Sequence, residues 1–153
     1  MTDSDPFKTT RLIAGNTQTE TIIHPAGKII SLPGSSFRAA NPDTDTVAID
    51  TTEGTIMAEG DNIGLTCPLQ LPDGVTITQI VVWGNAAATA ETFYLLKIGV
   101  NYGGASTITS GLIGTEITGL SEIIDNGLYH YYISTSGIDT NDMIYGARIK
   151  YAL

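Results

Sequence analysis

Hydrophobic and polar residues alternate along most of the chain with the two-residue period of β-strands. The alternation is clear near the C-terminus, where Tyr145, Ala147 and Ile149 share one face of a predicted strand and Arg148 and Lys150 share the other. A strand of this kind places one face in a core and its cations toward solvent or a neighbouring subunit.

Similar short segments, separated by Gly, Asn, Asp and Pro, predict about ten strands. The predicted strands are Leu12–Ala14, Glu20–His24, Lys28–Leu32, Val47–Asp50, Thr55–Ala58, Ile63–Leu69, Val75–Trp83, Phe93–Val100, Ser106–Ile113, Leu128–Thr135 and Met143–Tyr151. The 22 Thr and 20 Ile residues suit pleated strands, and the sequence predicts at most one short helical turn, near Ala86–Ala90. A parallel sheet would need crossover helices, so we predict an all-β, antiparallel, jelly-roll-like β-sandwich.

Two local features of the backbone are expected, a hairpin and a β-bulge. The tight turn at Pro25, Ala26 and Gly27 predicts a hairpin that joins the strands on either side of it. In Val75–Trp83 the apolar positions change phase, which predicts a β-bulge near Thr78 and Gln79.

Two predicted strands, Phe93–Val100 and Leu128–Thr135, are apolar on both faces. Such strands are either buried between two layers or covered by another chain. The second alternative implies an oligomer.

Charge is low in amount and uneven in position. Seven Lys and Arg residues against sixteen Asp and Glu give a formal charge of −9, which argues against nucleic acid or an anionic membrane as partner. Four of the seven cations lie in the first 38 residues, and the stretch 39–96 holds eight acids and no Lys or Arg. We therefore expect an N-terminal arm with short strands over residues 1–45, as part of the same unit, and a β-sandwich domain over residues 46–153.

No residue pattern points to catalysis, and we predict that the chain is not an enzyme and holds no cofactor or metal. Nucleophile-elbow and phosphate-binding glycine patterns are absent, and His24 and His130 stand alone in the sequence. Cys67 is the single cysteine and fits a small buried side chain. Asp43–Asp45, Asp125–Gly127 and Asp139–Asp142 are oxygen-rich loops of the kind that calcium favours, but such residues also form turns, and turn formation is the preferred explanation.

Four segments together resemble jelly-roll-like β-sandwich domains of virion surface proteins, of the capsid decoration or tail-fibre type, and of extracellular bacterial proteins. These segments are Ser31–Arg38, Pro68–Thr78, Asp125–Ile133 and Ile144–Tyr151. The resemblance covers roughly residues 31–153. It implies a structural or binding role and carries over no catalytic residue.

The first function expected is that of a non-enzymatic structural protein of a viral particle or similar extracellular assembly. It would act through subunit contacts as a homo-oligomer, with a trimer expected, and a capsid or fibre protein is the further partner considered. The polar segment Met1–Thr10 has no apolar stretch. We therefore expect a virion or extracellular assembly reached without a signal peptide, or otherwise the cytoplasm. The residues expected at subunit contacts are Lys8, Arg11, Lys28, Arg38, Phe93, Leu95 and Tyr132.

The alternative function is a carbohydrate- or receptor-binding β-sandwich module. Exposed aromatic rings stack on the apolar faces of ligands, although a sandwich core needs the same residues. The candidate platform consists of Trp83, Tyr102 and Tyr132.

Overall fold

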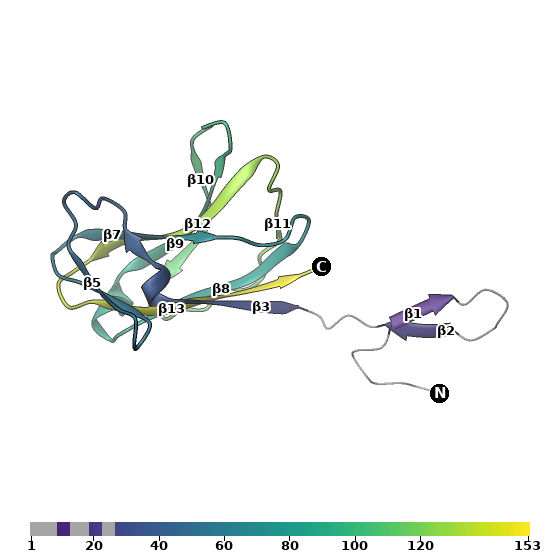
Figure 1. Ribbon diagram of the computed structural model, residues 1–153, viewed down its shortest axis with the longest axis horizontal. Helices are drawn as coiled ribbons and strands as arrows, with labels where there is room; N and C mark the ends of the chain where they lie inside the picture. Colours follow the sequence, from purple (N-terminus) through teal and green to yellow (C-terminus); the bar gives the residue numbers. More distant parts are fainter. Residues whose placement is uncertain (1–8, 13–18, 23–26) are drawn as a thin grey trace.

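The chain folds as an all-β, antiparallel, jelly-roll-like β-sandwich, so the predicted fold class is confirmed. The computed structural model describes residues 9–12, 19–22 and 27–153. Figure 1 shows two layers, with β7, β9 and β12 in one and β3, β8 and β13 in the other. The helices of the described residues are two 3-10 turns, η1 (Gly34–Ser36) and η2 (Ala87–Ala90), and none of them could span a membrane. The second is the short turn expected from the alanines.

One layer is a six-stranded sheet built around β13 (Met143–Ala152). β13 pairs antiparallel with β8 (Thr76–Gly84) and with β3 (Lys28–Pro33), so that Ile149 lies opposite both Ile80 and Ile30. The start of β13 pairs with β6 (Thr55–Ala58), and β6 pairs with β5 (Val47–Asp50). β11 (Glu122–Ile123) forms the edge beside β8.

The other layer is a five-stranded sheet built around β12 (Tyr129–Ile138). β12 pairs antiparallel with β9 (Thr92–Gly99) and β7 (Ile63–Leu69), so that Ile133 lies opposite both Leu95 and Cys67. The edges of this sheet are β10 (Ala105–Leu112), beside β9, and β4 (Arg38–Ala39), beside β7.

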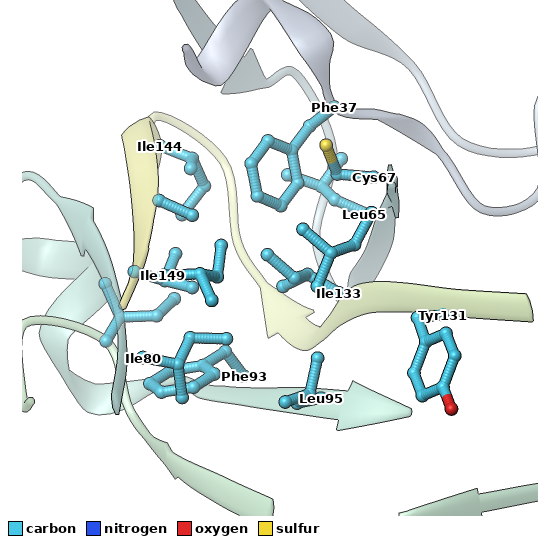
Figure 2. Packing of buried hydrophobic residues seen from close by; sticks show 14 of the residues in the cluster. Phe37, Leu65, Cys67, Ile80, Phe93, Leu95, Tyr131, Ile133, Ile144 and Ile149 are labelled. Atoms are coloured by element: carbon cyan, nitrogen blue, oxygen red, sulfur yellow. The ribbon is translucent and has the colours of Figure 1, made fainter. Parts of the chain in front are cut away.

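The core lies between the two sheets. Figure 2 shows Ile80, Ile144 and Ile149 of the six-stranded sheet meeting Leu95 and Ile133 of the five-stranded sheet. All five side chains are fully buried. Many of the abundant Ile residues therefore pack on the two inner faces, as expected for a sandwich.

The N-terminal part of the described chain differs from the expectation. β2 (Thr19–Ile22) pairs with β1 (Thr9–Leu12), and β3 pairs with β13. β2 and β3 therefore lie in different sheets and do not pair as the predicted hairpin, and Pro25 and Ala26 of its turn lie outside the described residues. From Lys28 onward the segment expected as an arm supplies β3, β4 and the fully buried Phe37 to the sandwich.

Two bulges shape the six-stranded sheet. The predicted bulge is confirmed at Thr78, since Gln79 pairs with Lys150 and Ile77 with Tyr151, leaving Thr78 unpaired. The Thr78 hydroxyl donates a hydrogen bond of 3.1 Å to the Lys150 carbonyl and holds this irregularity in place. The second bulge, in β13, was not predicted, and it builds the candidate site.

Candidate functional site

Two exposed aromatic side chains stand on the outer face of the six-stranded sheet, Trp83 from β8 and Tyr145 from β13. Their exposed fractions are 39% and 49%, whereas Val82 and Ile144, the residues before them in their strands, are fully buried. Together with Pro33 and Gly146 they line a hollow of about 380 Å³. An exposed cluster of rings around a shallow depression is a surface that can receive a flat apolar ligand face.

The bulge in β13 places Tyr145 on this face. Ile144 pairs with Gly84 and Gly146 pairs with Trp83, so Tyr145 is the extra residue of the strand. Bulges change the direction of a side chain in this way. The expectation that Tyr145 shares the inner face with Ala147 is therefore wrong, and Ile144 occupies the core instead.

Gly146 lines the bottom of the hollow and, having no side chain, leaves it unfilled. It lies directly opposite Trp83 on β8 and opposite Pro33 on β3. A Cβ atom at residue 146 would lie 2.5 Å from the Leu32 carbonyl oxygen, a distance that real side chains essentially never show. The main chain itself therefore forms the floor of the hollow at Gly146, because β3 and β13 approach too closely for a side chain.

Arg148 and Glu116 form the polar rim beside Trp83. The guanidinium carbon of Arg148 lies 4.9 Å from the centroid of the Trp83 ring, and Arg148 Nη2 donates a hydrogen bond of 3.0 Å to Glu116 Oε1. The cation–π contact and the ion pair fix the ring from one side. Because both charged side chains are more than a third exposed, they can also hydrogen-bond to a ligand seated on the ring.

A second candidate surface lies on the outer face of the five-stranded sheet. Tyr132 of β12 alternates with buried Tyr131 and Ile133, and it pairs with Leu96 on one side and Pro68 on the other. These outward residues form a half-exposed apolar row across three strands. A hollow of about 580 Å³ lies at the end of the row, where β7 leaves β12.

The structure separates the three predicted platform residues. Trp83 and Tyr132 lie on the outer faces of opposite sheets, and Tyr102 lies in the turn between β9 and β10 with an exposed fraction of 86%. A single platform of all three rings is therefore wrong. Tyr145 joins Trp83 instead, and the signal that could have found it is the glycine next to it within a strand, a frequent mark of a bulge.

The seven predicted subunit contacts divide into four groups, of which the buried pair Phe93 and Leu95 is the last. Lys8 lies outside the described residues, and the side chain of Arg11 in β1 is also not described. Lys28 and Arg38 are exposed in β3 and β4, where Arg38 Nη1 donates hydrogen bonds to the carbonyls of Phe37, at 2.7 Å, and Ser35. Tyr132 is half-buried on an outer face, as described above.

The expectation that Phe93 and Leu95 form subunit contacts is wrong, because both side chains are fully buried in the core of this same chain. The inner face of β9 faces the other sheet, and its outer face, with Tyr94 and Leu96, is only partly covered. The doubly apolar pattern is thus explained by one buried face and one half-exposed face. It does not by itself require a second subunit.

The Asp-rich loops use their carboxylates as turn residues. Asp125 Oδ1 accepts main-chain hydrogen bonds from Gly127 and Leu128, and Asp142 Oδ2 accepts one from Asp139. The hydroxyl and the main-chain N–H of Thr140 both donate hydrogen bonds to Asp61 Oδ1, and these bonds lower the pKa of Asp61. Over the described part of the chain no three His, Cys, Asp or Glu side chains are grouped so as to hold a metal ion.

No protein-family model matches the chain, and a search of curated proteins found no relative. Among solved structures, a xylan-binding module of family CBM15 matches with a TM-score of 0.45 and 14% identity, over 81% of this chain and 96% of the other. The C-terminal CBM6 of the marine laminarinase LamC from Zobellia galactanivorans matches with a TM-score of 0.44 and 9% identity, over 80% of this chain and 98% of the other. A family two carbohydrate esterase from Cellvibrio japonicus matches with a TM-score of 0.38 and 6% identity, over 84% of this chain and 34% of the other.

Proposed function

We propose that this chain is a non-catalytic carbohydrate-binding module that receives a glycan on the Trp83–Tyr145 hollow. The observation that carries the proposal is the pair of exposed rings that line one hollow together with the bare main chain at Gly146. Pyranose rings have an apolar face of C–H groups and an edge of hydroxyls. The exposed rings suit the apolar face, because burying it against an aromatic surface is favourable.

The polar rim suits the hydroxyl edge of the same ligand. Arg148 offers several N–H donors and Glu116 offers carboxylate oxygens, and the two already pair at 3.0 Å. A sugar hydroxyl both donates and accepts, so it can bridge such a pair without leaving a charge unpaired. An anionic ligand is less well suited, because Glu116 neutralises Arg148 and the chain carries a net charge of −9.

The site also fits binding rather than bond cleavage. Glycoside hydrolysis needs two carboxyl groups facing each other across the scissile bond. Glu116 is the one carboxylate placed by the described contacts beside the hollow, and it is paired with Arg148. The expected function is therefore to hold a glycan, not to transform it.

Trp83 is the single tryptophan of the chain, so its fluorescence reports directly on the proposed site. We would titrate the protein with xylohexaose, cellohexaose and laminarihexaose and follow the emission of Trp83. A saturable shift is expected with at least one of these neutral oligosaccharides. Calorimetry should then show that Trp83→Ala and Tyr145→Ala weaken binding of that sugar at least about tenfold, or 1.4 kcal/mol.

The matched control is Ile123→Ala, which removes another exposed apolar side chain from the same sheet. This variant should bind as the wild type does. Absence of binding to the three oligosaccharides and to a broad glycan array would overturn the proposal. So would full affinity in the Trp83→Ala variant, provided that its circular dichroism spectrum is unchanged.

A structural role through self-association is the second candidate function. One region favours it: residues 98–115, which form most of the β9–β10 hairpin, contain no charged residue, and Val100, Tyr102 and Leu112 are exposed there. Two copies that each carry −9 repel one another, and this repulsion is weakest where the contacting surfaces carry no charge. A contact between copies is therefore best placed on this hairpin.

Light scattering at micromolar concentration tests this second candidate. Self-association through the hairpin predicts a mass above 16.1 kDa that returns to the monomer mass in the Tyr102→Asp variant. A monomer mass for the wild-type protein would contradict it. The virion assembly and the trimer expected from the sequence stay predictions.

A further inference from the structure

The hollow beside Tyr132 is a larger depression than the Trp83–Tyr145 hollow, and it lies on the opposite sheet. It forms because β7 stops pairing with β12 at Leu69, while β12 continues alongside β9 back to Tyr129. Pro68 fits this place, because β4 pairs only with residues 65 and 66 and leaves the edge of β7 open beyond them. A proline at an open edge costs no ladder hydrogen bond.

The walls of this hollow are held by hydrogen bonds within the chain. Asn126 Nδ2 donates to the Leu71 carbonyl at 2.9 Å, and the Asn126 main-chain N–H donates to Asp73 Oδ1 at 2.8 Å. The Asp125 N–H donates to the Tyr131 hydroxyl at 2.9 Å. The loop at the open end is thus tied to the segment that follows β7 and to β12, and a ligand would not have to order it.

Polar side chains share the lining of the hollow with the apolar Pro68, Leu69 and Leu71. Gln70, His130 and the Tyr132 hydroxyl carry donors and acceptors, and within the described residues none of these three side chains has a hydrogen-bond partner. Among the residues that the structure describes, no Asp, Glu, Lys or Arg lines the hollow. Amide, imidazole and phenol groups around an aromatic ring match a neutral polyhydroxylated ligand, and the described lining offers no carboxylate, ammonium or guanidinium group to recognise an ionic one.

We infer that the Tyr132 hollow is a second carbohydrate site for neutral oligosaccharides, with Tyr132 as the stacking ring and Gln70 and His130 as hydroxyl partners. This inference rests on the proposed function and extends it. The two sites lie on opposite faces of one sandwich, since Trp83 points outward from the six-stranded sheet and Tyr132 from the five-stranded sheet. A module with two opposed sites binds two glycan chains and holds them together.

The NMR signals of two side chains, Trp83 and His130, distinguish binding at the two sites. The chain has one tryptophan, at the first site, and two histidines, of which His130 faces the second. Xylohexaose, cellohexaose and laminarihexaose would be added to 15N-labelled wild-type protein while the side-chain signals of Trp83 and His130 are followed by NMR. With the sugar that binds, both signals should move, and calorimetry should give two sugars per chain.

Single-site variants supply the decisive comparison. In the Trp83→Ala variant the His130 signal should still move and the stoichiometry should fall to one. In Tyr132→Ala the Trp83 signal should still move, again with one sugar per chain. Gln70→Ala is the milder variant, since its side chain is exposed, and it should weaken binding at the second site several-fold while leaving the Trp83 response unchanged.

The outcomes distinguish this inference from the proposed function. One sugar per chain, with all binding lost in Trp83→Ala and a static His130 signal, overturns the second site and leaves the first intact. Binding that survives Trp83→Ala unchanged but is lost in Tyr132→Ala supports the second site and overturns the first. No binding by the wild-type protein overturns both.

Bridging provides an independent readout. Wild-type protein should increase the turbidity of a solution of the polysaccharide from which the bound oligosaccharide derives, and both Trp83→Ala and Tyr132→Ala should abolish this increase. Turbidity retained in either variant would contradict bridging by two sites on one chain.

Discussion

Arg148 lies over the ring of Trp83, with its guanidinium carbon 4.9 Å from the ring centroid. The two residues come from neighbouring strands, since Arg148 pairs with Val81 and Trp83 pairs with Gly146. The cation therefore approaches the ring diagonally and leaves the position opposite Trp83 to the glycine. This arrangement fixes the orientation of the ring while keeping the hollow open.

Replacing Arg148 by methionine tests this relationship. Arg148→Met keeps an unbranched apolar stem and removes both the cation–π contact, which is worth about 0.5–2 kcal/mol, and the pair with Glu116. We expect sugar affinity at the Trp83 site to fall about three- to tenfold, with a red shift of the Trp83 emission before sugar is added. Glu116→Gln, which keeps the hydrogen-bonding shape, should lose less. Unchanged emission and affinity in Arg148→Met would show that Arg148 does not position the ring.

Gly146→Ala tests whether the floor of the hollow must be bare main chain. The added Cβ would meet the Leu32 carbonyl oxygen at 2.5 Å, so β3 must move away from β13. We expect a loss of about 1–3 kcal/mol in the free energy of unfolding, measured by urea denaturation, together with weaker sugar binding. The control is Gly103→Ala. Its added Cβ would lie 3.9 Å from Asn101 Oδ1, an ordinary contact distance, so little stability should be lost. Equal stabilities of the two variants would argue against the close approach.

Strand positions were largely predictable from the sequence, because a strand is a local pattern bounded by turn residues. β5, β6 and β7 begin and end at the residues predicted for them. Pairing was less predictable. β3 pairs with β13, more than a hundred residues away, and no local feature near Lys28 indicates that partner. The two-residue strands β4 and β11 are too short to show any period.

The candidate site was predictable only in part. Trp83 follows from its position at the end of a strand, but Tyr145 depends on a bulge that reverses the direction of the side chain. Strict alternation placed Tyr145 in the core. The prediction that Phe93 and Leu95 form subunit contacts was wrong for a related reason. A two-residue period shows that a strand has two apolar faces, but it does not show which face meets the other sheet.

Lys97 and Glu122 provide a test of how the two sheets are joined. Lys97 Nζ, on β9 of one sheet, donates to Glu122 Oε1, on β11 of the other, at 2.6 Å, and it also lies 4.8 Å from the centroid of the Tyr129 ring. Because both side chains are mostly covered, we expect Lys97→Met and Glu122→Gln each to lower the free energy of unfolding by about 1 kcal/mol. The effect should shrink in 1 M salt and should be non-additive in the double variant. Additive losses would show that the two side chains act independently.

Alkaline pH should destabilise the fold, chiefly through Cys67. Burial raises the pKa of its thiol from 9.0 to about 11, burial also raises the pKa of Tyr131, and the hydrogen bond to Glu122 raises the pKa of Lys97. In each case the folded state holds its proton more tightly than the unfolded state, so stability is fully present below the unfolded pKa and is lost as pH rises toward the folded pKa.

Urea denaturation between pH 8 and pH 11 should therefore show a steady fall in the free energy of unfolding above about pH 9. The thiol alone should account for about 2–3 kcal/mol by pH 11, because a tenfold difference in proton affinity between the folded and unfolded states corresponds to about 1.4 kcal/mol. Cys67→Ala should lose some packing energy at every pH but show a shallower fall over this interval. A Cys67→Ala curve parallel to that of the wild type would place the alkaline sensitivity in Lys97 and Tyr131 instead of the buried thiol.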